Sequence, residues 1–267
     1  MRKYLQVMKM SWQEAIMYKA NFFITSVVDV FRILAEVAFW GIYFEATGKR
    51  TIAGYDFSTM ITYYILMFLI RTLMNTGNIG TKVAEDIKLG KLSQYLIKPI
   101  NYFGYYYLKE LSRKSLEIGV TMLVFVPVFI FGSTYMVINV EAFHMLVYPI
   151  VLMLAFTLSY FLNIVISLSA FWLIEVTSIF FLKDITLDFL SGGIFPLDII
   201  PKIILRVFNL LPFMYIIFSP IKIINKGVTN TELLLGMSAQ VFWIIVLFLL
   251  AKFLWKKGIR HYSGTGI

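Results

Sequence analysis

Residues 191–227 read SGGIFPLDIIPKIILRVFNLLPFMYIIFSPIKIINKG, and this stretch decides the fold that we expect for the chain. It is apolar enough for a membrane, yet prolines cut it into short pieces, of which Ile199–Leu211 and Phe213–Ile224 are the longest. At about 1.5 Å per residue neither piece exceeds about 20 Å, whereas the hydrocarbon core of a bilayer is about 30 Å thick. Each proline also removes a backbone donor, which lipid cannot replace.

The stretch therefore predicts a broken, re-entrant hairpin of short helices over 191–227, packed within a helical bundle. On its first helix Lys202 and Arg206 lie on one face and apolar residues on the other, as in a helix at a membrane interface. The alternative is an unrelated proline-broken hairpin in some other protein with several spans. The glycines and prolines that define the predicted hairpin are Gly192, Gly193, Pro196, Pro201, Pro212 and Pro220.

The composition of the whole chain indicates an all-α integral membrane protein. Hydrophobic residues make up 60% and charged residues 15% of the 267 residues, whereas soluble domains have about 45–50% apolar and about 25% charged residues. This length accommodates about six transmembrane helices of roughly 20 residues each, in a single transmembrane domain over residues 1–267. The chain has no cysteine and its two histidines lie far apart, so we expect no disulfide, no metal site and no cofactor.

Hydrophobic segments predict the six spans. The fourth begins near His144 and the fifth ends near Leu190, with a turn between them at Ala170–Glu175. Residues 1–20 instead read as an amphipathic helix at the cytoplasmic membrane surface, with Trp12 on its apolar side. The alternative for residues 1–20 is the irregular start of the first span. The other predicted spans are approximately Phe22–Phe44, Ser58–Asn78, Ser115–Phe131 and Leu233–Leu254.

The distribution of Lys and Arg predicts the orientation of the chain in the membrane. With a cytoplasmic N-terminus, the inner segments hold 15 basic residues and the outer segments 6. Because basic residues accumulate on the cytoplasmic side, we expect both termini in the cytoplasm and the hairpin outside, in a multi-pass protein of the cell membrane. The net charge of +9 reflects the same bias, so we expect no nucleic-acid partner. We find no cleaved signal peptide in the sequence.

Two stretches carry a resemblance to a known family. The first is S-G-G-I-F-P-L-D-I-I-P at 191–201, followed by L-P-F at 211–213 and S-P at 219–220. The second is K-V-A-E-D-I-K-L-G-K-L-S-Q-Y-L-I-K-P-I-N at 82–101. Both resemble ABC-2 type permeases, the membrane subunits of one class of ATP-driven exporters. The resemblance covers most of the chain, including the surface helix and the order of six spans.

The second stretch belongs to the polar region 79–114, in which the sequence predicts two short helices. Val83–Leu89 is ended by Gly90, and Leu92–Ile97 is ended before Pro99. The resemblance implies that this cytoplasmic region rests in a groove of the ATPase subunit and transmits its closure. A solvated charged loop is the alternative. By resemblance, the residues of that contact are Glu85, Asp86, Ile87, Gly90 and Leu92.

Ionisable residues within membrane spans are candidates for function, because charges are costly there. Helical spacing puts the charges of the first span on one face, where they can pair with one another. We weigh two interpretations: the charges form a polar translocation path or its gate, or they form ion pairs that fix span 1 against span 5. Arg71, near the inner end of span 2, has a side chain long enough to extend to the cytoplasmic surface. The candidates are Asp29, Arg32 and Glu36 in span 1 and Lys183, Asp184 and Asp188 in span 5.

The resemblance implies the permease subunit of an exporter, which moves substrate between itself and a second permease, identical or paralogous. The sequence contains no G-x-x-x-x-G-K-[ST], no H-E-x-x-H and no G-x-S-x-G motif, so we expect no enzyme activity in this chain and ATP hydrolysis on a separate subunit. The alternatives are a secondary transporter, which often has paired broken helices, and an intramembrane enzyme, which needs a catalytic cluster.

Overall fold

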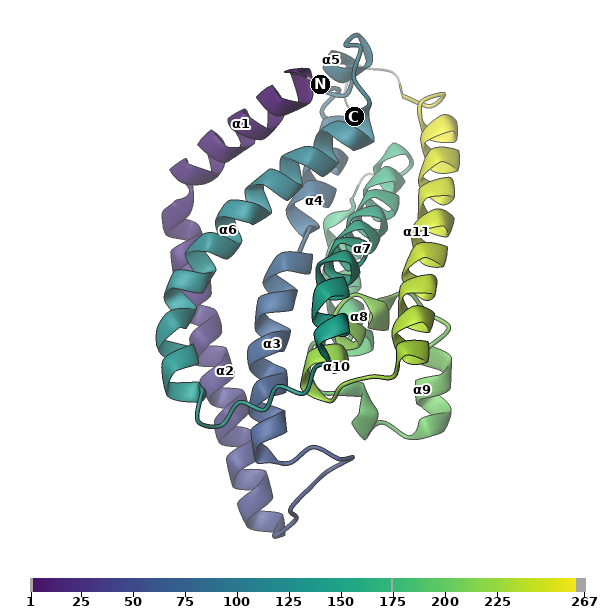
Figure 1. Ribbon diagram of the computed structural model, residues 1–267. Coiled ribbons are helices and arrows are strands. Elements are labelled where there is room, and N and C mark those ends of the chain that lie inside the picture. The colour runs from purple at the N-terminus through teal and green to yellow at the C-terminus, as the bar shows by residue number, and fades with distance from the viewer. Residues whose placement is uncertain (1, 174, 263–267) are drawn as a thin grey trace.

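The computed structural model describes residues 2–173 and 175–262, and over these residues the chain is helical without a β-strand (Figure 1). Short 3₁₀ turns η1 (Leu168–Phe171), η2 (Leu197–Ile199) and η3 (Phe213–Tyr215) separate some of the helices. The α-helices are α1 (Arg2–Met17), α2 (Lys19–Thr47), α3 (Phe57–Met74), α4 (Gly77–Lys88), α5 (Ser93–Leu96), α6 (Tyr102–Gly132), α7 (Ala142–Ser167), α8 (Thr177–Leu190), α9 (Lys202–Phe208), α10 (Phe218–Asn225) and α11 (Asn230–Gly258).

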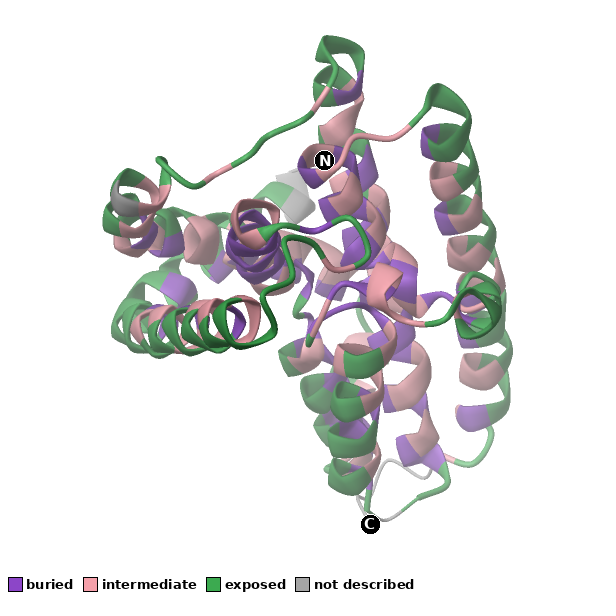
Figure 2. Cartoon of the chain, turned by 90° about the horizontal axis from the view of Figure 1, so that it is seen from below, coloured by how far each residue is buried: buried purple, intermediate pink, exposed green. Residues whose placement is uncertain are grey.

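Helix α3 is the centre of the bundle. Its residues from Met60 to Phe68 are all buried, as expected for a helix that is apolar on every side. Helices α2, α6, α7 and α10 surround it. In Figure 2 the buried residues concentrate at this centre, whereas the outer helices carry long exposed faces.

The outward faces of the bundle are apolar. Phe31 and Ile42 of α2 and Leu235 and Phe242 of α11 are all more than half exposed, which suits contact with lipid. Among the residues that the structure describes, three segments are long and apolar enough to cross a membrane: Phe57–Lys88, Ala142–Phe171 and Asn230–Gly258. The helical bundle and the membrane class therefore agree with the sequence prediction.

One predicted span is short and another ends early. The predicted fifth span is the 14-residue helix α8, which reaches only about 21 Å and is shorter than a bilayer core. Its position agrees with the prediction, because η1 ends at Phe171 and α8 begins at Thr177, on either side of the turn that we placed at Ala170–Glu175. The predicted second span ends early, because the helix stops at Met74 and α4 begins at Gly77.

The interruption between α3 and α4 frees backbone groups inside the bundle, and side chains from other helices bind them. Lys114 of α6 donates to the carbonyl oxygen of Thr72 at 2.5 Å, and Ser159 of α7 donates to that of Met74 at 2.6 Å. On the other side of the break, the amide of Gly77 donates to Asn75 Oδ1 at 3.2 Å. A buried helix end requires such partners, because water does not reach it.

The segment 191–227 is broken into η2, α9, η3 and α10. Pro196, Pro201 and Pro212 each precede one of the first three pieces, as the sequence predicts, whereas Pro220 lies in the first turn of α10 and does not break the chain there. Two tyrosines of α3 hold its first part: Tyr63 donates to the Gly192 carbonyl at 2.6 Å and Tyr64 to the Ile194 carbonyl at 2.9 Å. Gly192 has φ +83°, and a Cβ there would lie 2.6 Å from the Tyr63 hydroxyl, so only glycine fits. The segment lies at the end of the bundle opposite α5 (Figure 1).

Helix α1 is amphipathic but uses its faces differently from the prediction. It lies along α6 (Figure 1), where Ser11 donates to the Lys109 carbonyl at 2.7 Å and Ala15 is buried. Trp12, which we placed on the apolar side, donates through its indole to Ser115 at 2.8 Å but stays half exposed. The apolar side that faces outward, with Leu5 and Ile16, remains free for a membrane surface.

We expect Ser159→Ala to destabilise the fold. It leaves the buried Met74 carbonyl without a donor, at a cost of about 1–3 kcal/mol. Ser238→Ala is the matched control, because that hydroxyl donates to Leu234 within its own exposed helix α11. The measurement is thermal unfolding of the purified variants in detergent. Equal melting temperatures for the two variants would contradict the role given to Ser159.

Candidate functional site

Polar side chains from four elements meet at the interruption between α3 and α4. A cavity of about 230 Å³ lies there, between α3, α7, α8 and the residues that join α3 to α4. Arg71 Nη2 binds Asp188 Oδ2 at 2.6 Å, which joins α3 to α8. Lys183 Nζ donates to Asn163 Oδ1 of α7 at 2.9 Å and pairs with Asp184 Oδ1 at 2.5 Å. We call this space the polar cavity.

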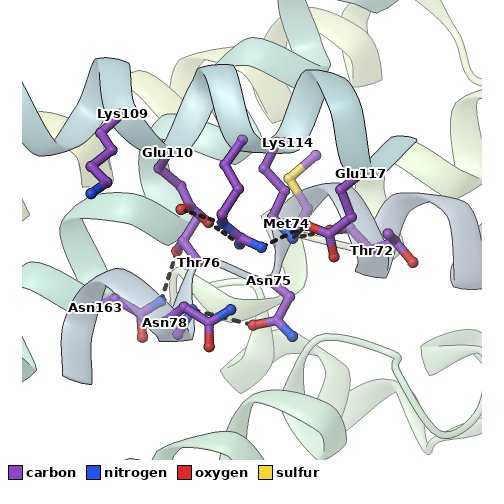
Figure 3. Close-up of polar contacts among 12 residues, drawn as sticks. Thr72, Met74, Asn75, Thr76, Asn78, Lys109, Glu110, Lys114, Glu117 and Asn163 are labelled. Carbon is purple, nitrogen blue, oxygen red and sulfur yellow. Dashed lines mark hydrogen bonds and ion pairs between the residues drawn. The ribbon is translucent and has the colours of Figure 1, made fainter. Parts of the chain in front are cut away.

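Helix α6 adds a second group of charges that sequence reasoning missed. Figure 3 shows Glu110, Lys114 and Glu117 pointing from α6 toward the residues that join α3 to α4. Arg113 binds both carboxylates, at 2.5 Å to Glu110 Oε1 and 2.9 Å to Glu117 Oε2, and Lys114 is 3.0 Å from Glu117 Oε2. Glu110 and Lys114 are fully buried. The group binds α6 to the end of α3.

We assigned Glu110, Arg113 and Lys114 to the polar cytoplasmic stretch 79–114, and Glu117 to the start of the third span. The structure instead places Tyr102–Gly132 in one continuous helix. The spacing Glu110, Arg113, Glu117 follows the three- and four-residue steps of a helix face and was the available signal. As a helical spacing, it predicts ion pairs along one face of a single helix.

The predicted charges of span 1 lie on one face of α2, as their spacing requires. Asp29, Arg32 and Glu36 are all half-buried and line one small cavity together with Arg71 of α3. Our expectation that ion pairs fix span 1 against span 5 needs a correction. The carboxylate of Asp188 in α8 binds Arg71 of α3, so the pair joins spans 2 and 5.

The predicted coupling residues divide into an exposed and a buried set. Glu85 is exposed, and its carboxylate lies 3.4 Å from Lys82 Nζ. Asp86, Ile87 and Leu92 are buried within this chain. Gly90 has φ +69°, a left-handed conformation that favours glycine and turns the chain between α4 and α5. Most of these residues therefore shape the turn and do not form its outer surface.

A buried carboxylate holds the base of this turn. Tyr102 donates to Asp86 Oδ2 at 3.1 Å, and Tyr106 donates to the same oxygen. Burial is the main cause that raises the pKa of both tyrosines, which lie in the part of α6 before the predicted third span. Both phenols therefore stay protonated at neutral pH and remain donors. From the other side, Tyr262 lies 3.1 Å from the Ser93 amide and 3.0 Å from its hydroxyl.

The outer surface of the turn is apolar. We call residues 88–98 the tip segment. Leu89, Leu96 and Ile97 are 57%, 46% and 84% exposed, and Lys91 and Lys98 beside them are also exposed. The tip segment lies at the same end of the bundle as the first turn of α1 and the last turn of α11 (Figure 1). The tip segment therefore has a base held by hydrogen bonds, an exposed apolar surface and exposed lysines beside that surface.

The arrangement offers binding and mechanical connection more than covalent chemistry. Within residues 2–173 and 175–262, no three His, Asp or Glu side chains gather to hold a metal ion. The carboxylates of the polar cavity and of α6 form ion pairs with Arg or Lys side chains, and these pairs hold them in place.

Comparison with known proteins gives one match. The model of a family described as ABC-2 family transporter protein matches residues 30–266. The match covers the bundle from α2 onward, including both the tip segment and the proline-broken segment. No curated protein matches the chain.

We expect the Arg71–Asp188 pair to contribute measurably to stability. A double-mutant cycle with Arg71→Gln and Asp188→Asn should give a coupling energy of about 1 kcal/mol or more, because both side chains are more than two-thirds buried. The control is Lys82 with Glu85, an exposed pair at 3.4 Å that should give about 0.5 kcal/mol or less. Unfolding of the purified variants supplies both energies. Additive single effects at Arg71 and Asp188 would show that the pair does not stabilise the fold.

Proposed function

Because the chain belongs to the ABC-2 transporter family, and is thus a membrane component of a transport system, we propose that it is the permease subunit of an ATP-driven exporter. Two permease subunits would face each other and form the translocation path, and separate ATPase subunits would dock on the cytoplasmic side. ATP binding would draw the tip segments of the two permeases together. The connected helices would then rearrange and move the substrate outward.

The observation that carries the proposal is the exposed apolar surface of the tip segment. A soluble loop gains nothing from leaving Ile97 84% exposed, whereas a docking surface does. Lys91 and Lys98 add positive charge around this surface. The ATPase groove that accepts it should therefore be apolar at its floor and acidic at its rim.

The fixed base of the tip segment supports a mechanical role. Asp86 ties α4 to the first turns of α6 through Tyr102 and Tyr106. Movement of the tip segment would therefore reach α6 through hydrogen bonds to a buried carboxylate, without local unfolding. In this proposal Asp86, Ile87 and Leu92 position the contact surface, and Glu85 with the exposed apolar residues forms it.

The charged residues of α2 and α8 support the proposal of a second permease subunit. Asp184 is 61% exposed on α8, beside the exposed apolar residues Phe181 and Ile185. An ionised carboxylate facing lipid is costly. We therefore propose that this face of α8 meets the partner permease across a water-filled path. Asp29, Arg32 and Glu36 of α2 would then lie near that path as its polar lining.

One observation favours a second candidate function. The interruption between α3 and α4 places polar residues at a broken helix, a feature that secondary transporters use to bind ions and substrates. A secondary transporter would move its substrate in vesicles that contain this chain without an ATPase subunit. An exporter of the proposed kind would require the ATPase and ATP.

We expect Ile97→Glu to prevent docking of the ATPase subunit. The change places a carboxylate on the apolar contact surface, and co-purification should fall at least about tenfold while membrane abundance is unchanged. Ile138→Glu is the matched control, since Ile138 is also exposed but lies in the loop between α6 and α7 at the other end of the bundle. The measurement is affinity purification of the chain from its native membrane, with the co-purified ATPase subunit quantified. Co-purification of the ATPase subunit with Ile97→Glu at the level of the parent protein would contradict the proposed docking surface.

We expect the tip segment to be cytoplasmic and Thr229 to be external. Gln94 represents the tip segment. Gln94 and Thr229 are both exposed, and the tip segment and the start of α11 lie at opposite ends of the bundle. Gln94→Cys and Thr229→Cys are clean probes, because the chain has no cysteine of its own. A membrane-impermeant maleimide should label only position 229 in intact cells and both positions after lysis. Labelling of position 94 in intact cells would show that the orientation is the reverse of the one that we propose.

A further inference from the structure

We propose that the C-terminal end of α11 binds the phosphate headgroup of an anionic phospholipid, whose acyl chains lie along the outer face of the same helix. The headgroup site is a groove of about 540 Å³ between the end of α11 and the residue that follows η1. The proposal goes beyond ATP-driven export and rests only on the membrane class of the chain. We call this space the basic groove, and its lining residues are Trp172, Phe253, Leu254, Lys257, Arg260 and His261.

The outer face of α11 carries a continuous apolar stripe. Its members follow one another at steps of three and four residues, which places them along one side of the helix, and each is more than half exposed: Phe242, Ile245, Leu249 and Phe253. From the first to the last of them the stripe is about 16 Å long, close to half of a bilayer core of about 30 Å and so to the depth of one leaflet. The opposite side of the helix is buried in the bundle, where α11 packs on α7, through Gln240, Leu247, Ala251 and Gly258.

The apolar stripe continues into cations at the end of the helix. Lys257 lies four residues after Phe253, and Arg260 follows three residues later, beyond a C-cap residue that keeps helical dihedral angles. Lys257 Nζ is 4.6 Å from the centre of the Phe253 ring, so the ammonium lies directly beside the end of the stripe. An apolar surface of one leaflet's depth that ends in two cations matches the order of acyl chain and phosphate in an anionic phospholipid.

The charge of the basic groove favours an anion. Its lining contains two full cations, Lys257 and Arg260, and no Asp or Glu. Neither cation forms an ion pair with a carboxylate of residues 2–173 and 175–262. From Leu233 to Ile267 the sequence has four basic residues and no acidic one. The partial negative charge at the C-terminal end of a helix is only about one half of an elementary charge, so the two cations exceed it.

The other wall of the groove places it at the level of lipid headgroups. Trp172 is partly exposed and meets His261 edge-on, with the ring centres 6.1 Å apart. Tryptophan is enriched at membrane interfaces because its ring is apolar and its N–H is polar. Glu175 follows Trp172 closely in the chain but does not line the groove, and its carboxylate accepts from the Thr177 amide at 2.6 Å. This wall therefore adds an interfacial side chain and no negative charge.

The same features select an anionic lipid over other ligands. A zwitterionic phospholipid brings an ammonium group along with its phosphate, and the two cations of the groove repel it. A soluble phosphate compound leaves the apolar stripe unused. Basic pockets at the ends of transmembrane helices attract anionic headgroups, and each Lys or Arg near the surface contributes to that attraction.

The test titrates the purified full chain in detergent with phosphatidylglycerol or phosphatidylcholine and counts bound lipids by native mass spectrometry. We expect phosphatidylglycerol to bind at least about fivefold more tightly, and equal affinities would overturn the proposal. Glycerol phosphate, which has the headgroup charge without acyl chains, should bind at least about tenfold more weakly than phosphatidylglycerol. Equal binding of these two would show a site for soluble anions and overturn the assignment to a lipid. No ATPase subunit takes part, so failure here is distinguishable from failure of the proposed exporter function.

A charge-matched pair of variants assigns the headgroup to the basic groove. Lys257→Gln combined with Arg260→Gln should weaken phosphatidylglycerol binding about tenfold and leave phosphatidylcholine binding unchanged. Both side chains are exposed, so the fold does not depend on them. The control is Lys202→Gln combined with Arg206→Gln, which removes the same charge from exposed positions of α9 at the other end of the bundle. Equal losses in the two double variants would exclude the basic groove as the site.

A second pair of variants tests the acyl chains. Leu249→Asn should weaken phosphatidylglycerol binding about threefold or more, because it removes apolar contact from the stripe. Glycerol phosphate binding should not change in this variant. Leu235→Asn is the control, since Leu235 is also exposed on α11 but lies toward its other end. Phosphatidylglycerol binding by Leu249→Asn at the level of Leu235→Asn would show that the chains do not lie on the stripe.

Discussion

The requirement that every buried backbone group finds a hydrogen-bond partner governs this structure. A continuous helix meets that requirement internally, but this chain interrupts its helices at two places inside the bundle. At the first place, between α3 and α4, Lys114 and Ser159 bind the freed carbonyls. At the second, Tyr63 and Tyr64 bind the carbonyls that follow α8. In both cases the partner side chain comes from a different helix, so the interruptions also connect the bundle.

The same requirement explains where the charges lie. Lys114 is buried because it completes the end of α3, and Glu117 balances its charge, while Arg113 pairs with both Glu117 and Glu110. Arg71 lies one turn from the end of α3 and is balanced by Asp188. Charge in this bundle therefore follows from the break in the helix. The candidate sites occupy this region because polar groups gather where the helix is discontinuous.

The sequence predicted well those features that depend on local residue pattern. Prolines 196, 201 and 212 set breaks of the segment 191–227, and Gly90 sets the turn between α4 and α5. It failed where the outcome depends on partners distant in the chain. The end of α3 is an exception, because Asn75 and Gly77 are a local stop signal that our second span, Ser58–Asn78, overlooked. Asp86 reads as a surface charge in a polar stretch, and only the fold brings two tyrosines to it.

Candidate residues show the same division. The face shared by Asp29, Arg32 and Glu36 follows from helical spacing alone and is present in α2. The partner of Asp188 did not follow from spacing, because Arg71 and Asp188 are 117 residues apart in the chain. Partner choice in a bundle depends on which helices are adjacent. That adjacency is set by the packing of α3 against α2, α6, α7 and α10, which no short stretch of sequence encodes.

The contact of Tyr262 with Ser93 gives α11 a mechanical property. Just beyond its C-terminal end this contact fastens the helix to the tip segment, and in its N-terminal half Gln240 donates to the Tyr215 carbonyl of η3 at 2.9 Å. The helix has 29 residues, so it is a rigid rod of about 44 Å between the two faces of the membrane domain. A tilt of such a rod by a few degrees displaces its far end by several ångströms. In the exporter that we propose, movement of the tip segment would thus become a lateral shift of this helix beside the proline-broken segment, without any change in helix length.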